Sequence, residues 1–213
     1  NLPMLKVIAE TKKPVLLSSG MSSWEELDNA VNTILKVHNN ITVMQCTSEY
    51  PCLYENVGLN IMVEMKERYQ LPIGFSDHTL TNFASYAAVT LGATVIEKHL
   101  TFSKKMYGSD AKHSIEPDEF KLLTEGINSI ERIITSKVDK DNIAVALSEM
   151  KEVFQKSIVT LVDITKGSII KNGMVGFKKP GTGIPASQID IVIGRKTKKQ
   201  IFKDYLIQEE DLD

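Results

Sequence analysis

The sequence predicts an α/β fold made of four strand–helix units, followed by a small, mostly β domain. Short apolar runs start near residues 14, 41, 72 and 93, and each is followed by a segment with helical periodicity. Apolar runs of this length, bounded by Gly and Pro, are typical of buried parallel strands. From about residue 144 the alternation stops, and short β-type segments separated by turn residues replace it.

The spacing of the four units leaves two architectures open. A complete (β/α)8 barrel has about 250 residues, which is roughly 31 for each unit. The spacing of the apolar runs fits that length. The units therefore form either an open four-stranded α/β sheet or the second half of a barrel.

Local patterns place the individual elements. Strands are expected over residues 15–18, 41–47, 72–78 and 93–99, and helices over residues 2–11, 22–38, 60–69, 82–91 and 116–134. Ser22 or Ser23 can cap the second helix, because Glu25 or Glu26 follows three residues later and completes a capping box. A long polar loop is expected at residues 101–114.

The second domain follows a charged linker. Short strands and turns are expected at residues 157–162, 167–170 and 194–195, and residues 178–184 form a Pro/Gly loop. A domain of about 60 residues has a thin core. We therefore expect it to pack against another surface.

The composition excludes several functional classes. Of the 213 residues, 42% are hydrophobic and 24% are charged, and the net charge is −2. We expect no nucleic-acid partner from this charge balance, and no membrane partner, because no apolar run approaches the roughly 20 residues that span a bilayer. Cys46 and Cys52 make no disulfide framework, so we expect reduced thiols in a cytoplasmic protein.

Two strand ends carry the main candidates for chemistry. Ser76 and His78 share one face of the third strand, and Glu97 and His99 share one face of the fourth. Side chains at the carboxyl ends of parallel strands meet at one edge of the sheet. The two imidazoles are either half of a divalent-metal site or satisfied core histidines. Glu97 either orients a ligand or forms a core ion pair with a lysine.

Other polar groups surround these strand ends. Hydroxyl groups follow three neighbouring strands, at Ser18, Ser19, Thr47, Ser48 and Ser76. They either hold an anion such as phosphate or act as ordinary caps. The loop residues Asp110, Lys112 and His113 are either functional or simply solvated. Lys178 and Lys179 precede a Gly-Thr-Gly turn that contacts an anion or a sugar, or is only a polar turn; no P-loop or dinucleotide fingerprint is present.

Taken together, these segments resemble the sialic acid synthase (N-acetylneuraminate synthase) family in order and spacing. The matching segments are residues 14–21 (PVLLSSGM), 45–51 (QCTSEYP), 74–79 (GFSDHT), 97–99 (EKH) and 108–114 (GSDAKHS). The tail from Ser157, with residues 179–183 (KPGTG), is similar to the C-terminal antifreeze-like (SAF) domain of that family. The resemblance implies the second half of a (β/α)8 TIM barrel at residues 1–135, a linker at 136–155 and a SAF domain at 156–213.

The resemblance also implies a reaction. Such enzymes condense phosphoenolpyruvate with an N-acetylated hexosamine, here N-acetylmannosamine, and water to give N-acetylneuraminate and phosphate. They use a divalent metal, Mn²⁺ or Mg²⁺, which polarises the sugar aldehyde while C3 of phosphoenolpyruvate attacks it. Legionaminic or pseudaminic acid synthesis, and an inactive binding or assembly module, are the alternatives.

Individual residues take their roles from matching family positions. His78 and His99 match the metal ligands, and Glu97 joins them in the catalytic group. Substrate-binding positions are matched by Ser18 and Ser76 (phosphate), Ser48 (often Asn in relatives), Tyr50 and Asp110 (sugar), and Lys179. Lys179 stands where many members have an Arg, so the charge is kept but the bidentate fork is lost.

Family members carry four further strand–helix units before the matching region. We therefore expect this chain to be a C-terminal fragment that has no synthase activity by itself. The resemblance implies a domain-swapped homodimer for the full-length protein.

Overall fold

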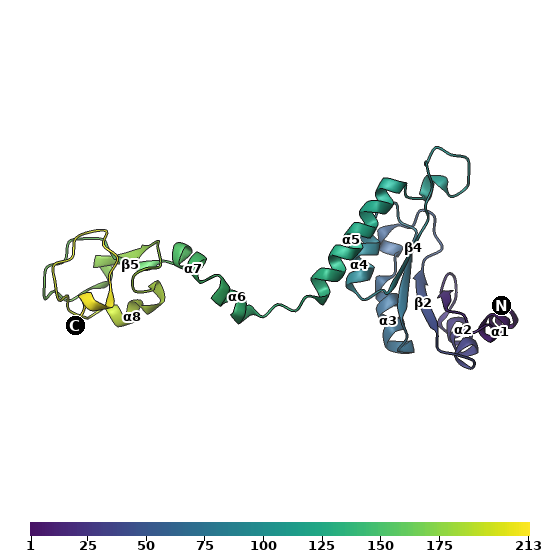
Figure 1. Cartoon of the computed structure of the whole chain (residues 1–213), viewed down its shortest axis with the longest axis horizontal. Coiled ribbons are helices and arrows are strands. Elements are labelled where there is room, and N and C mark those ends of the chain that lie inside the picture. The colour runs from purple at the N-terminus through teal and green to yellow at the C-terminus, as the bar shows by residue number, and fades with distance from the viewer. The chain divides into compact units, whose positions relative to one another are not determined.

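The computed structural model describes all residues from 1 to 213 and divides them into two compact units, residues 1–137 and 138–213 (Figure 1). Each unit has a hydrophobic core of its own. None of the helices combines the length and the apolar character that crossing a membrane requires.

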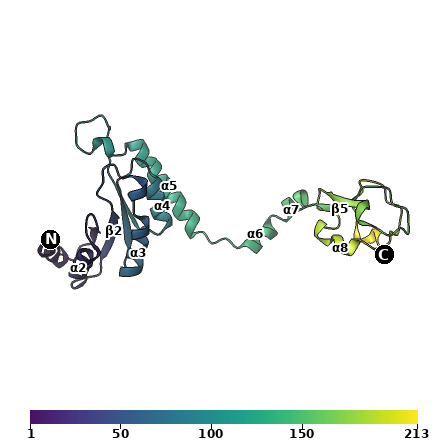
Figure 2. The same ribbon diagram turned by 180° about the vertical axis from the view of Figure 1, so that it is seen from behind.

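The first unit is an α/β structure, as predicted. Its four strands are parallel and lie in the order β1-β2-β3-β4: β1 (Val15–Ser18), β2 (Ile41–Cys46), β3 (Ile73–Asp77) and β4 (Val95–Lys98). The helices are α1 (Leu2–Glu10), α2 (Trp24–Leu35), α3 (Leu59–Tyr69), α4 (Phe83–Thr90) and α5 (Pro117–Thr135) (Figures 1 and 2). The sequential strand order is that of a barrel segment and differs from a doubly wound sheet, whose strand order reverses.

The capping box of α2 forms as predicted. Ser23 Oγ accepts a hydrogen bond from the Glu26 N–H at 3.3 Å, and Glu26 Oε2 accepts one from the Ser23 N–H at 2.9 Å. The helix ends at Leu35, earlier than the polar residues at 38–40 indicated. These reciprocal bonds fix the turn between β1 and α2.

The two faces of the sheet have different environments. Side chains of one alternation phase, including Val43, Ile73 and Phe75, form the core with the helices. The other phase places Ser18, Met44, Gly74 and Val95 in one row across the four strands, and Cys46, Ser76 and Glu97 in the next row. The second row therefore faces away from the helical core.

Gly74 allows Met44 to lie across the second face of the sheet. A methyl group at Gly74 would lie 2.1 Å from Met44 Sδ and 2.9 Å from the Val95 carbonyl oxygen, which belongs to the backbone and cannot swing aside. We expect Gly74→Ala to lower the free energy of unfolding of the first unit by about 1–3 kcal/mol, the usual effect of overpacking. Gly173→Ala, where nothing lies within 4 Å, is the control in a thermal unfolding experiment; equal small shifts in both variants would contradict this account.

An ion pair joins α2 to α3, and it should make the stability of the first unit depend on pH. Asp28 accepts hydrogen bonds from Arg68 at 2.6 and 2.9 Å and from the Tyr69 hydroxyl at 2.8 Å. The Arg68 bonds, followed by the Tyr69 bond, lower the pKa of Asp28. A depressed carboxyl pKa stabilises the fold above the unfolded pKa of about 3.9, and this contribution is lost as the pH falls through the folded pKa.

We therefore expect Arg68→Gln to lower the free energy of unfolding of the first unit near neutral pH. In strong acid, the free energies of unfolding of the variant and the wild type should differ less. Urea unfolding at both pH values measures this difference. Lys121→Gln removes an exposed pair with Glu125, whose charged atoms are 3.9 Å apart, and serves as the control. A difference between Arg68→Gln and the wild type that does not change with pH would rule out the Asp28 explanation.

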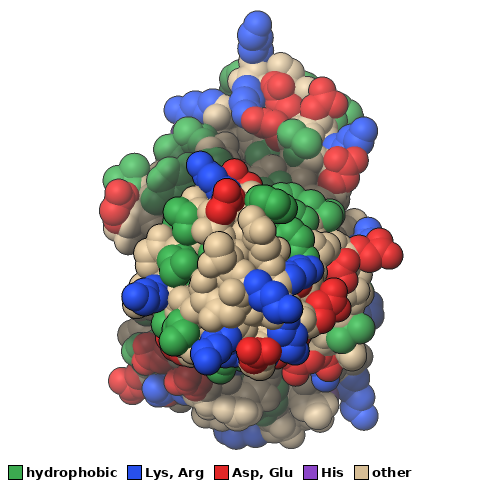
Figure 3. Space-filling view, turned by 90° about the vertical axis from the view of Figure 1, so that its left-hand side faces the viewer, with side chains coloured by type: hydrophobic (Ala, Val, Ile, Leu, Met, Phe, Trp, Pro, Cys, Tyr) green, Lys and Arg blue, Asp and Glu red, His purple; other side chains and the backbone are tan.

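The second unit is a small, partly β structure. Strands β5 (Ser157–Thr160) and β6 (Val175–Lys178) are antiparallel, and α8 spans Ile189–Val192. Helices α6 (Lys140–Ala146) and α7 (Ser148–Phe154) lie in the segment expected to be a linker. On the face that Figure 3 shows, Lys and Arg side chains lie among Asp and Glu side chains.

The second unit contains less regular strand than the sequence predicts. Residues 167–170 contain only an isolated bridge between Ile169 and Lys196. Strand β6 lies in a segment for which the sequence predicts no strand. Gly176 lacks a side chain that would strengthen the β pattern, and a methyl group at this position would lie 3.0 Å from Leu161 Cδ2.

Candidate active site at the carboxyl ends of the strands

Three loops bring aromatic side chains together at the carboxyl ends of β2, β3 and β4. The rings of His78 and His99 are edge to face, with centroids 5.4 Å apart. The Tyr50 ring, from the loop after β2, lies 4.2 Å from the His78 ring and 5.6 Å from the His99 ring. The strand pattern predicted that the two imidazoles meet, the resemblance added Tyr50, and the fold brings the three rings together.

Hydrogen bonding determines which nitrogen of His78 is free. His78 is 7% exposed, and its Nδ1 lies 2.8 Å from the Thr47 carbonyl oxygen. A carbonyl oxygen only accepts, so Nδ1 carries a proton, and in the neutral tautomer Nε2 has the lone pair. Nε2 lies 3.4 Å from Ser76 Oγ. His78 is thus oriented as metal-ligating histidines usually are, with its second nitrogen bound to a backbone carbonyl.

Ser76 and Glu97 are register partners on β3 and β4. Ser76 Oγ donates a hydrogen bond to Glu97 Oε1 at 2.8 Å. Glu97 therefore pairs with a serine rather than with a lysine, the alternative that the sequence left open. Since a hydroxyl has one proton, Ser76 must rotate away from Glu97 before it can donate to a bound anion.

Three of the five strand-end hydroxyls make hydrogen bonds within the fold, and one of these is the Ser76–Glu97 bond described above. Ser19 Oγ accepts from the Cys46 N–H at 3.1 Å and donates to Gln45 Oε1 at 3.3 Å, and Thr47 Oγ1 donates to the Asn56 carbonyl at 2.8 Å. Ser18 and Ser48 are exposed. Ordinary structural bonding therefore explains Ser19 and Thr47, whereas Ser18, Ser48 and Ser76 remain candidates for substrate binding.

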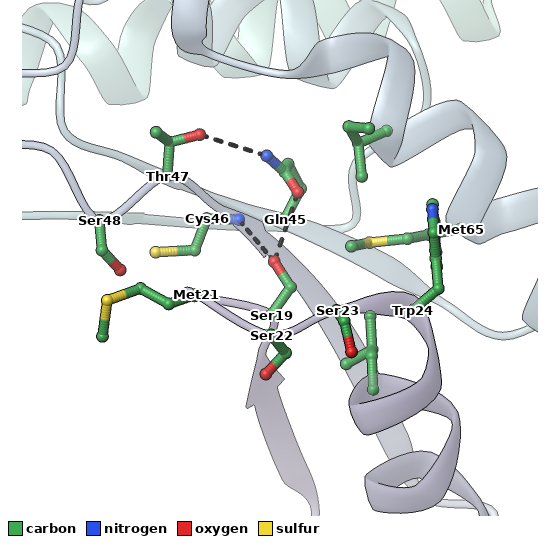
Figure 4. A pocket seen from close by; sticks show the side chains of 13 residues that line it. Ser19, Met21, Ser22, Ser23, Trp24, Gln45, Cys46, Thr47, Ser48 and Met65 are labelled. Atoms are coloured by element: carbon green, nitrogen blue, oxygen red, sulfur yellow. Dashed lines mark hydrogen bonds between the residues drawn. The ribbon is translucent and has the colours of Figure 1, made fainter.

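A pocket of about 470 Å³ lies beside β1 and β2 (Figure 4). Its polar lining includes Ser19, Thr47 and Ser48, and its apolar lining includes Trp24 and Met65. The dashed hydrogen bonds in Figure 4 join Ser19 and Thr47 to their neighbours in this wall. Of Ser19, Thr47 and Ser48, only Ser48 is exposed.

The loop after β4 forms a second hollow beside His99. This hollow of about 370 Å³ is lined by His99, Tyr107 and Asp110, among others. Asp110 Oδ2 lies 3.9 Å from His99 Nδ1, and the Asp110 side chain is 60% exposed. Lys112 is exposed, and His113 ends the 3₁₀ turn Ala111–His113. Asp110 is thus the residue of this loop that joins the histidine site.

Tyr50 keeps its proton in this environment. Partial burial, and then the negative potential of Cys46, Asp110 and Glu97, raise the pKa of Tyr50. The phenol therefore remains a hydrogen-bond donor at neutral pH.

Lys179 belongs to the second unit, and its local setting is well defined. Its Nζ lies 4.5 Å from the centre of the Phe154 ring, at the end of α7. The Gly181 N–H donates to the Glu152 carbonyl at 2.6 Å. The last turn of α7 therefore supports the loop that carries Lys179, partly through a cation–π contact.

The sequence interpretation missed one ion pair. Lys98 Nζ lies 2.9 Å from Asp77 Oδ2, and the two side chains are 2% and 0% exposed. Burial lowers the pKa of Lys98, and Asp77 opposes that shift. Opposite charges at matched positions in two adjacent strands, one residue before each histidine, were the signal that could have revealed the pair.

The donor set fits a divalent metal with an incomplete protein shell. His78 offers Nε2, and the partly exposed His99 lies beside it. No group of three or more His, Cys, Asp or Glu side chains is arranged to hold a metal ion. Two imidazoles with water and substrate oxygens as further ligands would satisfy a hard or borderline divalent ion.

The comparisons with known proteins cover nearly the whole chain. Residues 1–139 match the NeuB family, and residues 155–213 match the SAF domain. The N,N'-diacetyllegionaminic acid synthase of Campylobacter jejuni is 39% identical over 98% of this chain and 63% of its own length. The enzyme of the same name from Legionella pneumophila is 34% identical over 92% of this chain and 56% of its own length.

A solved structure gives a similar result. The N-acetylneuraminic acid synthetase of Leptospira borgpetersenii superposes with a TM-score of 0.64 and 30% identity, over 71% of this chain and 53% of the other. The chain thus spans less than two thirds of the length of each of these relatives.

Proposed function

Because this chain belongs to the NeuB family, we propose that it forms part of a synthase that condenses phosphoenolpyruvate with an N-acetylated hexosamine. The observation that carries this proposal is the meeting of His78, His99 and Tyr50 beside the Ser76–Glu97 hydrogen bond. We further propose that the four units are the second half of a (β/α)8 barrel. The sequential parallel sheet supports this architecture.

We propose that His78, through Nε2, and His99 hold Mn²⁺ or Mg²⁺. When bound, the ion supplies Lewis-acid polarisation of the open-chain sugar aldehyde. Thr47 keeps the His78 ring oriented through the bond to Nδ1. Asp110 lies close enough to His99 to balance positive charge at this edge of the sheet.

The remaining residues bind substrate and move protons. The exposed Ser18 hydroxyl and the rotated Ser76 hydroxyl donate to the phosphate of phosphoenolpyruvate, and Tyr50 donates to the sugar. A C–C bond forms between C3 of phosphoenolpyruvate and the aldehyde carbon. The C2=C3 double bond of phosphoenolpyruvate is consumed in this step, so positive charge develops at C2 and water adds there. As the C2–O bond to phosphate breaks, C2 becomes a ketone, and the two protons of the water go to the aldehyde oxygen and to the departing phosphate. Glu97 is the carboxylate placed to hold a proton during these steps.

The sugar itself has two candidates. N-acetylmannosamine is the substrate that the synthase class implies, and a structure of an N-acetylneuraminic acid synthetase supports it. A diacetamido hexose is favoured by the 39% identity with an N,N'-diacetyllegionaminic acid synthase. Lys179, in the loop after β6, matches a family position that reaches into the site of the partner subunit, and we propose that it contacts the N-acyl group of a sugar bound there.

The test is phosphate release by the protein as its source cells make it. The assay supplies phosphoenolpyruvate with N-acetylmannosamine or with a 2,4-diacetamido hexose. We expect release with one of these sugars, loss of release after chelation, and recovery when Mn²⁺ or Mg²⁺ is restored. No release with either sugar in the presence of metal would refute the synthase assignment.

A further inference from the structure

The buried ion pair lies directly behind the two histidines. Asp77 immediately precedes His78, Lys98 immediately precedes His99, and Asp77 and Lys98 are register partners on β3 and β4. Because successive side chains of a strand point to opposite faces, the pair and the imidazoles lie on opposite sides of the sheet. Each charged residue is therefore joined to a histidine by a single peptide bond, on the opposite face of the sheet.

A closed set of hydrogen bonds ties the pair to the backbone around His78. Lys98 Nζ contacts Asp77 Oδ2 at 2.9 Å and donates to the Thr79 carbonyl at 2.9 Å. The Thr79 N–H in turn donates to Asp77 Oδ1 at 2.8 Å. Ser85 Oγ, on α4, donates to Asp77 Oδ2 at 2.6 Å. The residues on both sides of His78 are thus held from β4 and from α4.

We infer that Asp77 and Lys98 are positioning residues that set the spacing and orientation of the two imidazoles, an inference that rests on the metal site proposed above. Neither side chain contacts the rings. Together they fix the His78 turn so that its Nδ1 reaches the Thr47 carbonyl, and they fix the start of the His99 loop. Groups that hydrogen-bond directly to metal ligands commonly change metal affinity by about 10–100-fold when they are removed, and this pair, which acts through the backbone, is expected at the lower end of that range.

The first test needs no metal. The variant is Asp77→Asn/Lys98→Met, which removes both charges together and so leaves no unpaired charge buried. Imidazole ¹⁵N NMR of the metal-free chain reports the tautomer of His78, with His78→Gln to assign the signal. We expect one Nδ1–H tautomer in the wild type and a mixture in the double variant. An unchanged Nδ1–H tautomer in a folded double variant would overturn the inference.

The second test measures binding of Mn²⁺ alone, by the loss of the free-ion EPR signal. We expect the Mn²⁺ dissociation constant to rise about tenfold or more in the double variant. Ile34→Ala, in the core of the first unit on α2, is the control for lost stability, and Lys121→Met is the control for a lost surface charge. Both controls should bind as the wild type does; equal binding by the double variant would count against positioning.

Failure of the proposed metal site and failure of the positioning inference give different results. If the wild type binds no Mn²⁺, the proposed metal site is refuted, and the NMR result alone decides whether the pair positions His78. If the double variant does not fold, Asp77→Asn replaces it, because this change removes the charge that pairs with Lys98 and nearly keeps the side-chain volume. A folded Asp77→Asn variant with an unchanged His78 tautomer would overturn the inference.

Discussion

Replacing His78 or His99 with alanine is expected to reduce turnover by more than about 100-fold, because loss of a second-layer partner alone already costs 10–100-fold in such sites. Each change removes one of only two imidazoles at the carboxyl ends of β3 and β4, whose ring centres are 5.4 Å apart. The measurement is phosphate release by the protein as its source cells make it, across a Mn²⁺ titration. The expected result is loss of the response to metal as well as loss of rate.

His38→Ala is the matched control for both variants. His38 follows α2, and its Nδ1 accepts a hydrogen bond from the Asn40 N–H at 3.1 Å, outside the group of rings around Tyr50. Turnover should stay near that of the wild type. If His78→Ala and His99→Ala both behaved like His38→Ala, the metal assignment would be wrong.

Replacing Lys98 with methionine is expected to lower the free energy of unfolding of the first unit by about 3–5 kcal/mol. The change leaves the buried Asp77 carboxylate without its positively charged partner. Asp77 has a side chain that is 0% exposed, and it would keep only the Ser85 and Thr79 donors. Asp77→Asn should cost less, since Lys98 can lose its proton: burial already lowers the pKa of Lys98. Urea unfolding measures both variants.

The double variant Asp77→Asn/Lys98→Met separates charge burial from packing. Removing both charges should recover most of the stability that Lys98→Met loses, because a neutral buried pair carries little desolvation cost. Lys121→Met, which removes an exposed pair, should change stability by less than about 1 kcal/mol. A Lys98→Met variant as stable as Lys121→Met would show that the Asp77 charge is not held buried in solution.

The sequence by itself determined the elements whose signals are local. The apolar runs before residues 18, 46, 77 and 98 predicted the parallel strands, because strands buried on both faces need continuous apolar side chains. Ser23 and Glu26 predicted the start of α2, because both hydrogen bonds of a capping box join residues three apart. The side-chain alternation also placed Ser76 and Glu97 on the same face of the sheet.

Only the tertiary structure decided which of these groups meet and how each is bonded. That Ser76 pairs with Glu97, Ser19 with Gln45, and His78 with the Thr47 carbonyl depends on strand register. The Asp77–Lys98 pair escaped the sequence interpretation for the same reason. The two residues are 21 positions apart, and their contact exists only because β3 and β4 align in one register, which a pattern within either strand alone does not record.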